Sequence, residues 1–176
     1  MLQIDIPPYK KEYVDGWLVL MEEGLFVKRR ENNCIELKND EGKVIRIVGS
    51  REDCDRCLKG MEAIPDYDKY MSCIHLDYTD IDYLLFKGDQ VSYSILTWNI
   101  EFEDLSKAQD DLTTLIHENV DSIKRFFIFI YGNFKRLDRY SQFLGAIDGM
   151  ASEDADLMFQ VLLNENEASI LCALFQ

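Results

Sequence analysis

Apolar and polar positions alternate through much of the first half of the chain, which predicts β-strands. Apolar residues occupy every second position over 2–6, the period of a strand with one buried face, and a continuous apolar run over 16–21 fits a strand buried on both faces. The segment 34–48 predicts a hairpin, because two apolar runs flank the turn-forming residues Asn39 to Gly42. Three more strands are predicted within 71–78, 82–88 and 90–102, the last with a bulge near Leu96, where the apolar residues change parity.

One helix interrupts these strands, over about 50–63. Ser50 can cap its first turn, and Asp53 three positions later forms an approximate capping box. The helix is predicted to end before Pro65, because the residue that precedes a proline disfavours helical geometry.

The second half of the chain follows a helical period. From Leu105 to Ile130 the apolar residues recur at helical spacing, which predicts one long helix or two joined near Asn119, with a stop at Gly132. Two more helices are predicted, one around Phe134 to Ile147 and one that opens at Ser152. The segment 168–176 fits either a helix or a strand.

These elements predict an α+β fold. A mostly antiparallel N-terminal sheet, with one helix over about 50–63, is followed by a C-terminal helical half that packs on it. The 176 residues are expected to form a single domain, 1–176, with possible subdomains 1–103 (rich in β-strands) and 104–176 (helical).

The charge balance narrows the classes of partner. The chain has 33 acidic and 19 basic residues, a formal net charge of −14, and its last Lys or Arg is Arg139. A field of this sign repels nucleic acid and anionic membranes and attracts basic proteins. Direct nucleic-acid binding and membrane binding are therefore not expected, whereas a basic protein partner is.

Cysteine usage and the apolar runs indicate a compartment. Five Cys at irregular spacing do not form a disulfide framework, and reduced, buried thiols suit the cytosol. The longest apolar run, Phe126 to Tyr131, is too short to span a bilayer. A soluble, cytoplasmic protein is expected.

Two sets of residues could hold a metal ion. Cysteine and histidine ligands would come from Cys34, Cys54, Cys57, Cys73 and His75. The stronger expectation is that these Cys are small buried hydrophobic residues, because the Cys54-x-x-Cys57 pair lies within a predicted helix. The second set, His75, Asp77, Asp80 and Asp82 with Glu101 or Glu103, would form the site of a metal-dependent enzyme if these side chains converged.

The remaining constellation is a surface in which Asp and Tyr alternate. The candidate partner-binding residues are Asp66, Tyr67, Asp68, Asp77, Tyr78, Asp80, Asp82 and Tyr83. Tyr is enriched in binding hot spots, and Asp supplies the negative charge that a basic partner recognises. The alternative is that the rings pack in the core and the carboxylates are ordinary solvated positions of a strand.

The leading hypothesis is a non-catalytic acidic protein that blocks a basic partner. An immunity protein, an antitoxin or a phage-type inhibitor of a nucleic-acid-handling enzyme would fit, with a toxin or nuclease as the partner. No catalytic motif and no cofactor-binding motif is found, so no cofactor is expected. The alternatives are the metal-dependent enzyme above and a structural or adaptor domain in an assembly, such as a homodimer that shields the apolar run from Phe126 to Tyr131.

Overall fold

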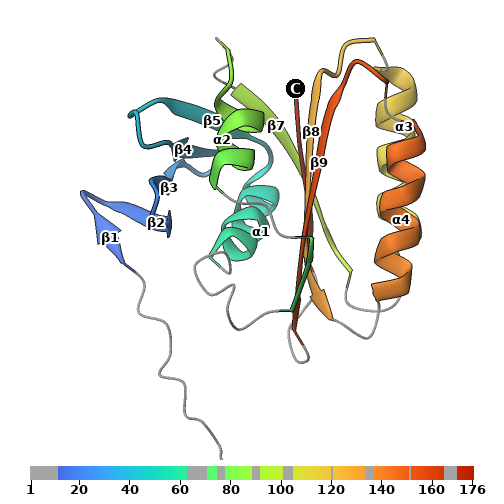
Figure 1. The fold of residues 1–176 in the computed structure, drawn as a ribbon, viewed down its shortest axis with the longest axis horizontal. Coiled ribbons are helices and arrows are strands. Elements are labelled where there is room, and N and C mark those ends of the chain that lie inside the picture. Colours follow the sequence, from blue (N-terminus) through green and yellow to red (C-terminus); the bar gives the residue numbers. More distant parts are fainter. Residues whose placement is uncertain are drawn as a thin grey trace, which may run out of the picture.

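A single mixed β-sheet dominates the part of the chain that the structure, a computed structural model, describes. These residues are 12–62, 71–74, 78–88, 92–100, 105–119, 121–133, 137–150, 152–164 and 170–176. Ten strands in them form one sheet, and four helices pack on its two faces (Figure 1).

The bounds of the elements show that helices and strands are interleaved along the chain. The strands are β1 (Tyr13–Val14), β2 (Trp17–Met21), β3 (Leu25–Glu31), β4 (Cys34–Lys38), β5 (Val44–Val48), β6 (Met71–Ile74), β7 (Ser92–Asn99), β8 (Arg125–Asn133), β9 (Asp156–Asn164) and β10 (Ile170–Phe175). The helices are α1 (Arg51–Met61), α2 (Tyr78–Phe86), α3 (Ser106–Glu118) and α4 (Leu137–Met150).

The strand order is β1-β2-β3-β4-β5-β7-β10-β8-β9-β6. Strands β1 to β5 form an antiparallel meander, β5 pairs parallel with β7, and β10 lies antiparallel between β7 and β8. Strand β9 pairs parallel with β8 and antiparallel with β6. The predicted helical C-terminal half is therefore wrong, because three strands of the second half, β8, β9 and β10, lie inside the same sheet.

Helices cover both faces of this sheet. In Figure 1, α1 and α2 lie between the curled β1–β5 part and the β7–β10 part, and α3 and α4 lie on the opposite face. Two clusters of buried residues match these layers. One joins the inner faces of β2 to β5 with α1 and α2, and the other joins α3 and α4 with the outer faces of β8 and β10.

Strand β8 explains why the helical interpretation of 120–130 failed. Phe127 and Phe129 point into the first cluster, whereas Phe126, Ile128 and Ile130 point into the second. A strand with both faces covered has apolar residues at every position, so it shows no alternation that would distinguish it from a helix. The run that motivated a homodimer is thus buried within a single copy of the chain, with Ile128 at 0% exposure.

The same two-sided burial removes the predicted bulge in β7. Tyr93 and Ile95 lie in the first cluster, and Trp98 and Ile100 lie in or against the second. The register with β10 continues without interruption from Ser94 to Asn99. The change of apolar parity reflects the two covered faces and no irregularity of the backbone.

Other local predictions divide between correct and wrong. The hairpin is confirmed: β4 pairs with β5, and the Gly42 N–H donates to the Asn39 carbonyl in its turn. The helix capped by Ser50 is also confirmed, with the Asp53 N–H donating to the Ser50 hydroxyl. The strand predicted over 82–88 is wrong because α2 occupies it, and the helix predicted from Ser152 is wrong because β9 follows. The ambiguous tail is strand β10, and the strand predicted over 2–6 lies outside the described residues.

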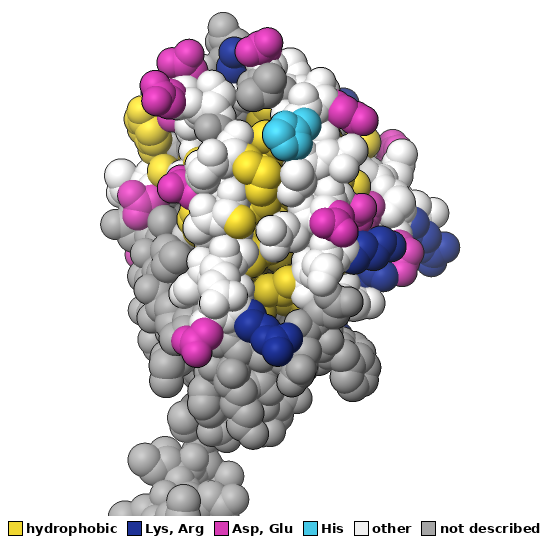
Figure 2. Space-filling view, turned by 90° about the vertical axis from the view of Figure 1, so that its right-hand side faces the viewer, with side chains coloured by type: hydrophobic (Ala, Val, Ile, Leu, Met, Phe, Trp, Pro, Cys, Tyr) yellow, Lys and Arg dark blue, Asp and Glu magenta, His cyan; other side chains and the backbone are white. Residues whose placement is uncertain are grey.

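The α3–α4 face presents its apolar side chains along a narrow seam, with charged side chains mainly toward its rim (Figure 2). The large apolar side chains that are exposed in the described segments, Tyr13, Val14, Val48 and Tyr83, lie on other elements. No helix within these segments is long and apolar enough to cross a membrane.

Helix α4 contains an exposed glycine that lowers its stability. Gly145 lies in the middle of the helix, and a Cβ added there would meet no atom within 4 Å. Because glycine costs about 0.8–1 kcal/mol relative to alanine in a helix interior, we expect Gly145→Ala to raise the free energy of unfolding by about 0.5–1 kcal/mol. Urea denaturation checks this, and a destabilised variant would show that another part of the protein contacts this face.

Candidate functional site

The structure places four of the eight predicted partner-binding residues in helix α2. These are Tyr78, Asp80, Asp82 and Tyr83. The other four, Asp66, Tyr67, Asp68 and Asp77, lie outside the described residues, as do the proposed metal ligands His75, Glu101 and Glu103. Residues two apart on a helix point about 200° apart, so Asp80 and Asp82 do not share a face as they would on the predicted strand.

The N-terminal half of α2 is fastened to the turn between β4 and β5. The Tyr78 hydroxyl donates to Asp40 Oδ1 at 2.6 Å and accepts from the Asp40 N–H at 3.1 Å. Asp82 Oδ1 accepts from Asn39 Nδ2 at 3.0 Å, and Asn39 is itself buried. Tyr78 and Asp82 therefore bind the helix to the hairpin, and their polar atoms are engaged within the chain.

The C-terminal carbonyls of α2 also receive donors from distant segments. The Tyr93 hydroxyl donates to the Leu85 carbonyl at 2.8 Å, and Arg125 Nη1 donates to the Leu84 carbonyl at 3.1 Å. The Lys43 ammonium donates to the carbonyls of Phe86 and Gly88. The last carbonyls of a helix lack intrahelical partners, so these contacts fix α2 at both ends.

Four carboxylates lie on two turns that touch beside the start of α2. A Cβ on Gly24 would lie 2.5 Å from the Asp40 Cβ, which shows that the β2–β3 turn touches the β4–β5 turn. We name this surface the acidic corner and define it by Glu22, Glu23, Asp40 and Glu41. All four are exposed, whereas Asp80 of α2 points away from the turn that Tyr78 and Asp82 contact.

The acidic corner carries largely uncompensated negative charge. Within the described residues, Glu22, Glu23, Asp40 and Glu41 form no ion pair. The nearby Lys43 ammonium is held by the C-terminal carbonyls of α2. The described His, Cys, Asp and Glu side chains include no group of three or more that could hold a metal ion. The corner is therefore a spread of separate carboxylates, a geometry that suits recognition of several positive charges.

Tyr78 gives this corner a pH signature. Burial and the hydrogen bond to Asp40 raise the pKa of Tyr78 to about 12. The protonated phenol is thus stabilised by folding, and this contribution is complete below the unfolded pKa of about 10 and lost as the pH rises toward 12.

The Tyr78→Phe variant tests this contribution. We expect it to lose about 1 kcal/mol of stability at neutral pH, where the phenol donates its hydrogen bond. The difference from the wild type should shrink between pH 10 and about 12, which chemical denaturation at a series of pH values measures. A difference that stays constant up to pH 12 would contradict the assignment.

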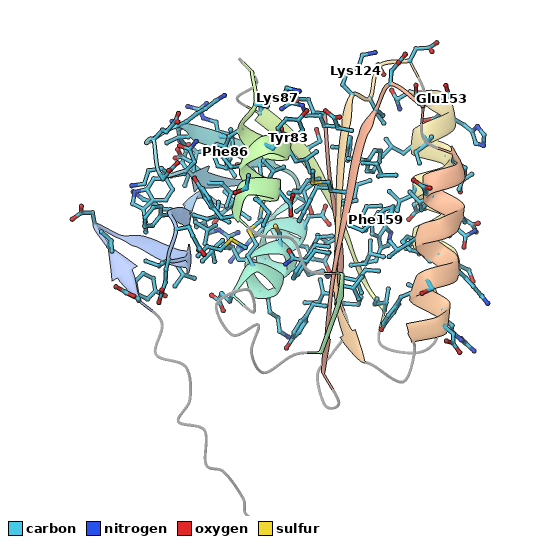
Figure 3. All side chains as sticks on the ribbon, viewed as in Figure 1. Tyr83, Phe86, Lys87, Lys124, Glu153 and Phe159 are labelled. Carbon is cyan, nitrogen blue, oxygen red and sulfur yellow. The ribbon has the colours of Figure 1, made fainter. Side chains whose placement is uncertain are left out.

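Tyr83 is the exposed aromatic residue of α2. Half of its surface is accessible, and the Lys87 ammonium lies 4.4 Å from its ring centroid and donates to its hydroxyl at 2.8 Å (Figure 3). This pair lies one turn beyond Asp80 and faces solvent. Of the predicted residues in α2, Tyr83 is thus the aromatic side chain available to a partner.

A separate groove of about 420 Å³ lies beside the C-terminal half of β7. Strand β5 pairs only with Ser92 to Ser94, so beyond that point the side of β7 away from β10 borders α1 and not a strand. Asp53 of α1 blocks this edge by accepting from the Thr97 N–H at 3.0 Å and from Thr97 Oγ1 at 2.6 Å. The groove also contains Trp98, whose indole N–H donates to Asp111 at 2.8 Å.

The cysteine prediction is confirmed for the thiols that the structure describes. Cys34, Cys54, Cys57 and Cys172 are free and buried. A hydrogen bond with Cys172, together with burial, raises the pKa of the Cys57 thiol well above its usual value. Burial also raises the pKa of Cys54, so the C-x-x-C pair lacks the activated thiolate of a redox motif.

Comparisons with known proteins give a similarity of fold only. No protein-family model and no curated protein matches the chain. A mutant of FtsZ from M. jannaschii matches with a TM-score of 0.50 at 16% identity over 71% of this chain and 38% of that one. A dimer of the same FtsZ, without ligand, has a TM-score of 0.49 at 14% identity, covering 72% and 37% of the two chains. TubZ of Bacillus thuringiensis serovar israelensis, in GDP-form protofilaments, has a TM-score of 0.47 at 14% identity, covering 71% and 36%.

These comparisons correct one functional expectation. The three structures named above are of FtsZ and TubZ, and none of them is an inhibitor, an immunity protein or an antitoxin. The expectation of one of these classes finds no support among the comparisons and is not kept. The chain spans between 36% and 38% of the length of these structures.

The acidic corner was missed in the sequence because it depends on contacts between distant turns. Its signal is a pair of acids next to a glycine in each of two turns, Glu22-Glu23-Gly24 and Asp40-Glu41-Gly42, of which only the second was predicted. Nothing in the spacing of these turns along the chain indicates that they touch. The Asp and Tyr residues over 66–83 therefore indicated only the helix that contacts the acidic corner, and not the two turns that form it.

Proposed function

We propose that this chain is a non-catalytic binding domain whose acidic corner recognises a basic segment of a protein. The observation that carries the proposal is the meeting of the two acidic turns and the start of α2, held by the Tyr78–Asp40 hydrogen bonds. The net charge of −14 supports it, because the field of the whole molecule steers a basic partner toward the surface. The four free buried thiols support a reducing compartment, the cytoplasm.

The rigidity of the corner favours recognition over a merely solvated surface. Asn39 is buried with its amide bound to Asp82, and its carbonyl oxygen Oδ1 accepts from the Lys43 N–H at 2.8 Å. The turn that carries Asp40 and Glu41 is thus fixed from inside. Carboxylates on a fixed turn lose little conformational freedom when a cationic partner binds, which lowers the cost of association.

An arginine-rich peptide labelled with a fluorophore tests the proposal. We define the corner variant as Glu22→Gln, Glu23→Gln and Glu41→Gln, which leaves the structural Asp40 in place. The control variant, Asp110→Asn, Glu118→Gln and Asp148→Asn, removes the same charge from exposed positions of α3 and α4. Fluorescence anisotropy gives the peptide affinity of both variants and of the wild type at several salt concentrations.

The two variants separate a local site from a general charge effect. We expect the corner variant to weaken peptide binding by about tenfold or more and to flatten its salt dependence, because tenfold corresponds to 1.4 kcal/mol spread over three lost charges. The control variant should change the affinity much less. Equal losses in the two variants would mean that only the net charge matters, and the proposal would fail.

A further inference from the structure

The outer face of the β2–β5 meander has the opposite charge to the rest of the molecule. Residues that alternate with the buried positions of these strands point away from α1 and α2. On this outer side lie Lys28, Arg30, Lys38 and Arg46 against two carboxylates, Glu36 and, at the end of β3, Glu31. We name this surface, together with Trp17 and Phe26, the basic face.

Cross-strand pairing arranges the charged side chains of the basic face in a regular array. Lys28 of β3 pairs with Glu36 of β4, which pairs with Arg46 of β5. The Arg30 guanidinium lies 3.7 Å from the Glu36 carboxylate. The four cations against two carboxylates leave a net positive charge on this face, although the whole chain carries −14.

Two aromatic rings hold the lysines in place. The Lys38 ammonium lies 4.6 Å from the ring centroid of Trp17 and 5.0 Å from that of Phe26, and the Lys28 ammonium lies 5.5 Å from Trp17. Cation–π contacts of this kind restrict the side chains before any partner binds. Both rings remain partly exposed, and Trp and Arg are the residues most enriched in binding hot spots.

We propose that the basic face binds the acidic corner of a second copy of this chain. The inference rests on the proposed function of the corner and names its partner. Charge complementarity carries it: one surface presents four carboxylates that form no ion pair within the described residues, and the other presents four cations against two acids. The contact we propose is head-to-tail, so each copy keeps one free surface of each kind.

A nucleic-acid strand fits the observations less well. Its phosphates would meet the basic face, but the acidic corner lies at the end of the same meander, because Asp40 follows Lys38 by two residues. A long polyanion would thus extend from the cations toward the carboxylates. In addition, lysine ammonium groups lie over the rings on which bases would stack.

The net charge predicts an unusual salt dependence for association between copies. Two molecules of charge −14 repel at low ionic strength, where the Debye length is about 30 Å at 0.01 M. At about 0.15 M the Debye length falls to about 8 Å, which screens the molecules as wholes but not two patches in contact. Association should therefore be strongest at intermediate salt and weaker at both about 0.01 M and about 1 M.

Complementary variants test the head-to-tail contact by sedimentation velocity at protein concentrations up to about 0.5 mM. The face variant, Lys28→Gln with Arg46→Gln, removes two exposed cations of the basic face, and Lys59→Gln with Lys107→Gln removes two exposed cations elsewhere. The corner variant is the one defined above. We expect the wild type and the Lys59/Lys107 control to associate, and the face and corner variants, each alone, to bind copies at least about tenfold more weakly.

Mixing the two defective variants gives the decisive result. The face variant retains a normal acidic corner and the corner variant retains a normal basic face, so their mixture should form dimers and nothing larger. A mixture that stays monomeric, or a wild type that stays monomeric at every salt concentration, overturns the inference. Peptide binding to the wild type separates the two proposals: a wild type that binds the arginine-rich peptide through its corner but does not self-associate refutes only the inference, whereas a wild type whose peptide binding does not depend on the corner refutes the proposed function.

Discussion

We expect the Gly24→Ala variant to lose about 3 kcal/mol or more of stability, a large share of the total for a domain of this size. Gly24 has φ of +128°, a conformation that L-residues rarely adopt. A Cβ there would also lie 2.5 Å from the Cβ and 2.9 Å from the Cα of Asp40. Backbone strain and a clash with main-chain atoms act together, and neither can be relieved by a side-chain rotation.

Gly42 provides the matched control for Gly24. It has φ of +80°, but a Cβ at this position would meet nothing within 4 Å. The Gly42→Ala variant should therefore show only the strain of the left-handed conformation, about 1 kcal/mol. Urea denaturation of both variants measures the difference, and equal losses would mean that the two turns do not touch and that the acidic corner is not assembled as described.

The Asp53→Ala variant is expected to lose about 2–4 kcal/mol of its free energy of unfolding. Asp53 Oδ1 accepts from the N–H and the hydroxyl of Thr97, and Thr97 is only 6% exposed. Asp53 Oδ2 also lies 2.8 Å from the Ser50 hydroxyl at the start of α1. Removal of the carboxylate leaves buried donors without their acceptor, which costs more than the loss of an average hydrogen bond.

A double-mutant cycle and a neighbouring acid control this prediction. Thr97→Val removes the hydroxyl that donates a hydrogen bond to Asp53. The double variant should therefore lose less stability than the sum of the two single variants, by about 1 kcal/mol. Asp55→Ala removes an exposed acid of the same helix, paired with Arg29, and should lose less than about 1 kcal/mol. Strict additivity, or an Asp55 effect as large as that of Asp53, would contradict the role given to this carboxylate.

Sequence reasoning identified only a part of the surface that α2 and the two acidic turns form. The concentration of Asp and Tyr over 66–83 did identify a segment that contacts the acidic corner, through the hydrogen bonds of Tyr78 with Asp40. Its geometry was wrong, because Ile81, Leu84 and Leu85 are buried at helical spacing on a run too short to distinguish a helix from a strand. The carboxylates Glu22, Glu23 and Glu41 were not identified, because the contact of Gly24 with Asp40 joins turns of two different hairpins.

Local sequence determined those elements whose signals are complete within a few residues. The β4–β5 hairpin follows from its turn chemistry, and the start of α1 follows from Ser50 and Asp53, whose reciprocal contact needs no distant partner. The net charge of −14 is likewise a property of composition. The positive charge of the basic face does not follow from composition, because it arises only when the sheet places alternate residues of β3, β4 and β5 side by side.

Tertiary structure alone decided the nature of β8, β9 and β10. Their residues are apolar on both sides because helices and the curled meander cover both faces of the sheet, so the alternation that marks a half-buried strand is missing. Helical periodicity and a fully buried strand then look alike in the sequence. Pairing between strands that are distant in the chain resolved this ambiguity: the backbone of Phe126 to Tyr131 pairs with β10 on one side and with β9 on the other.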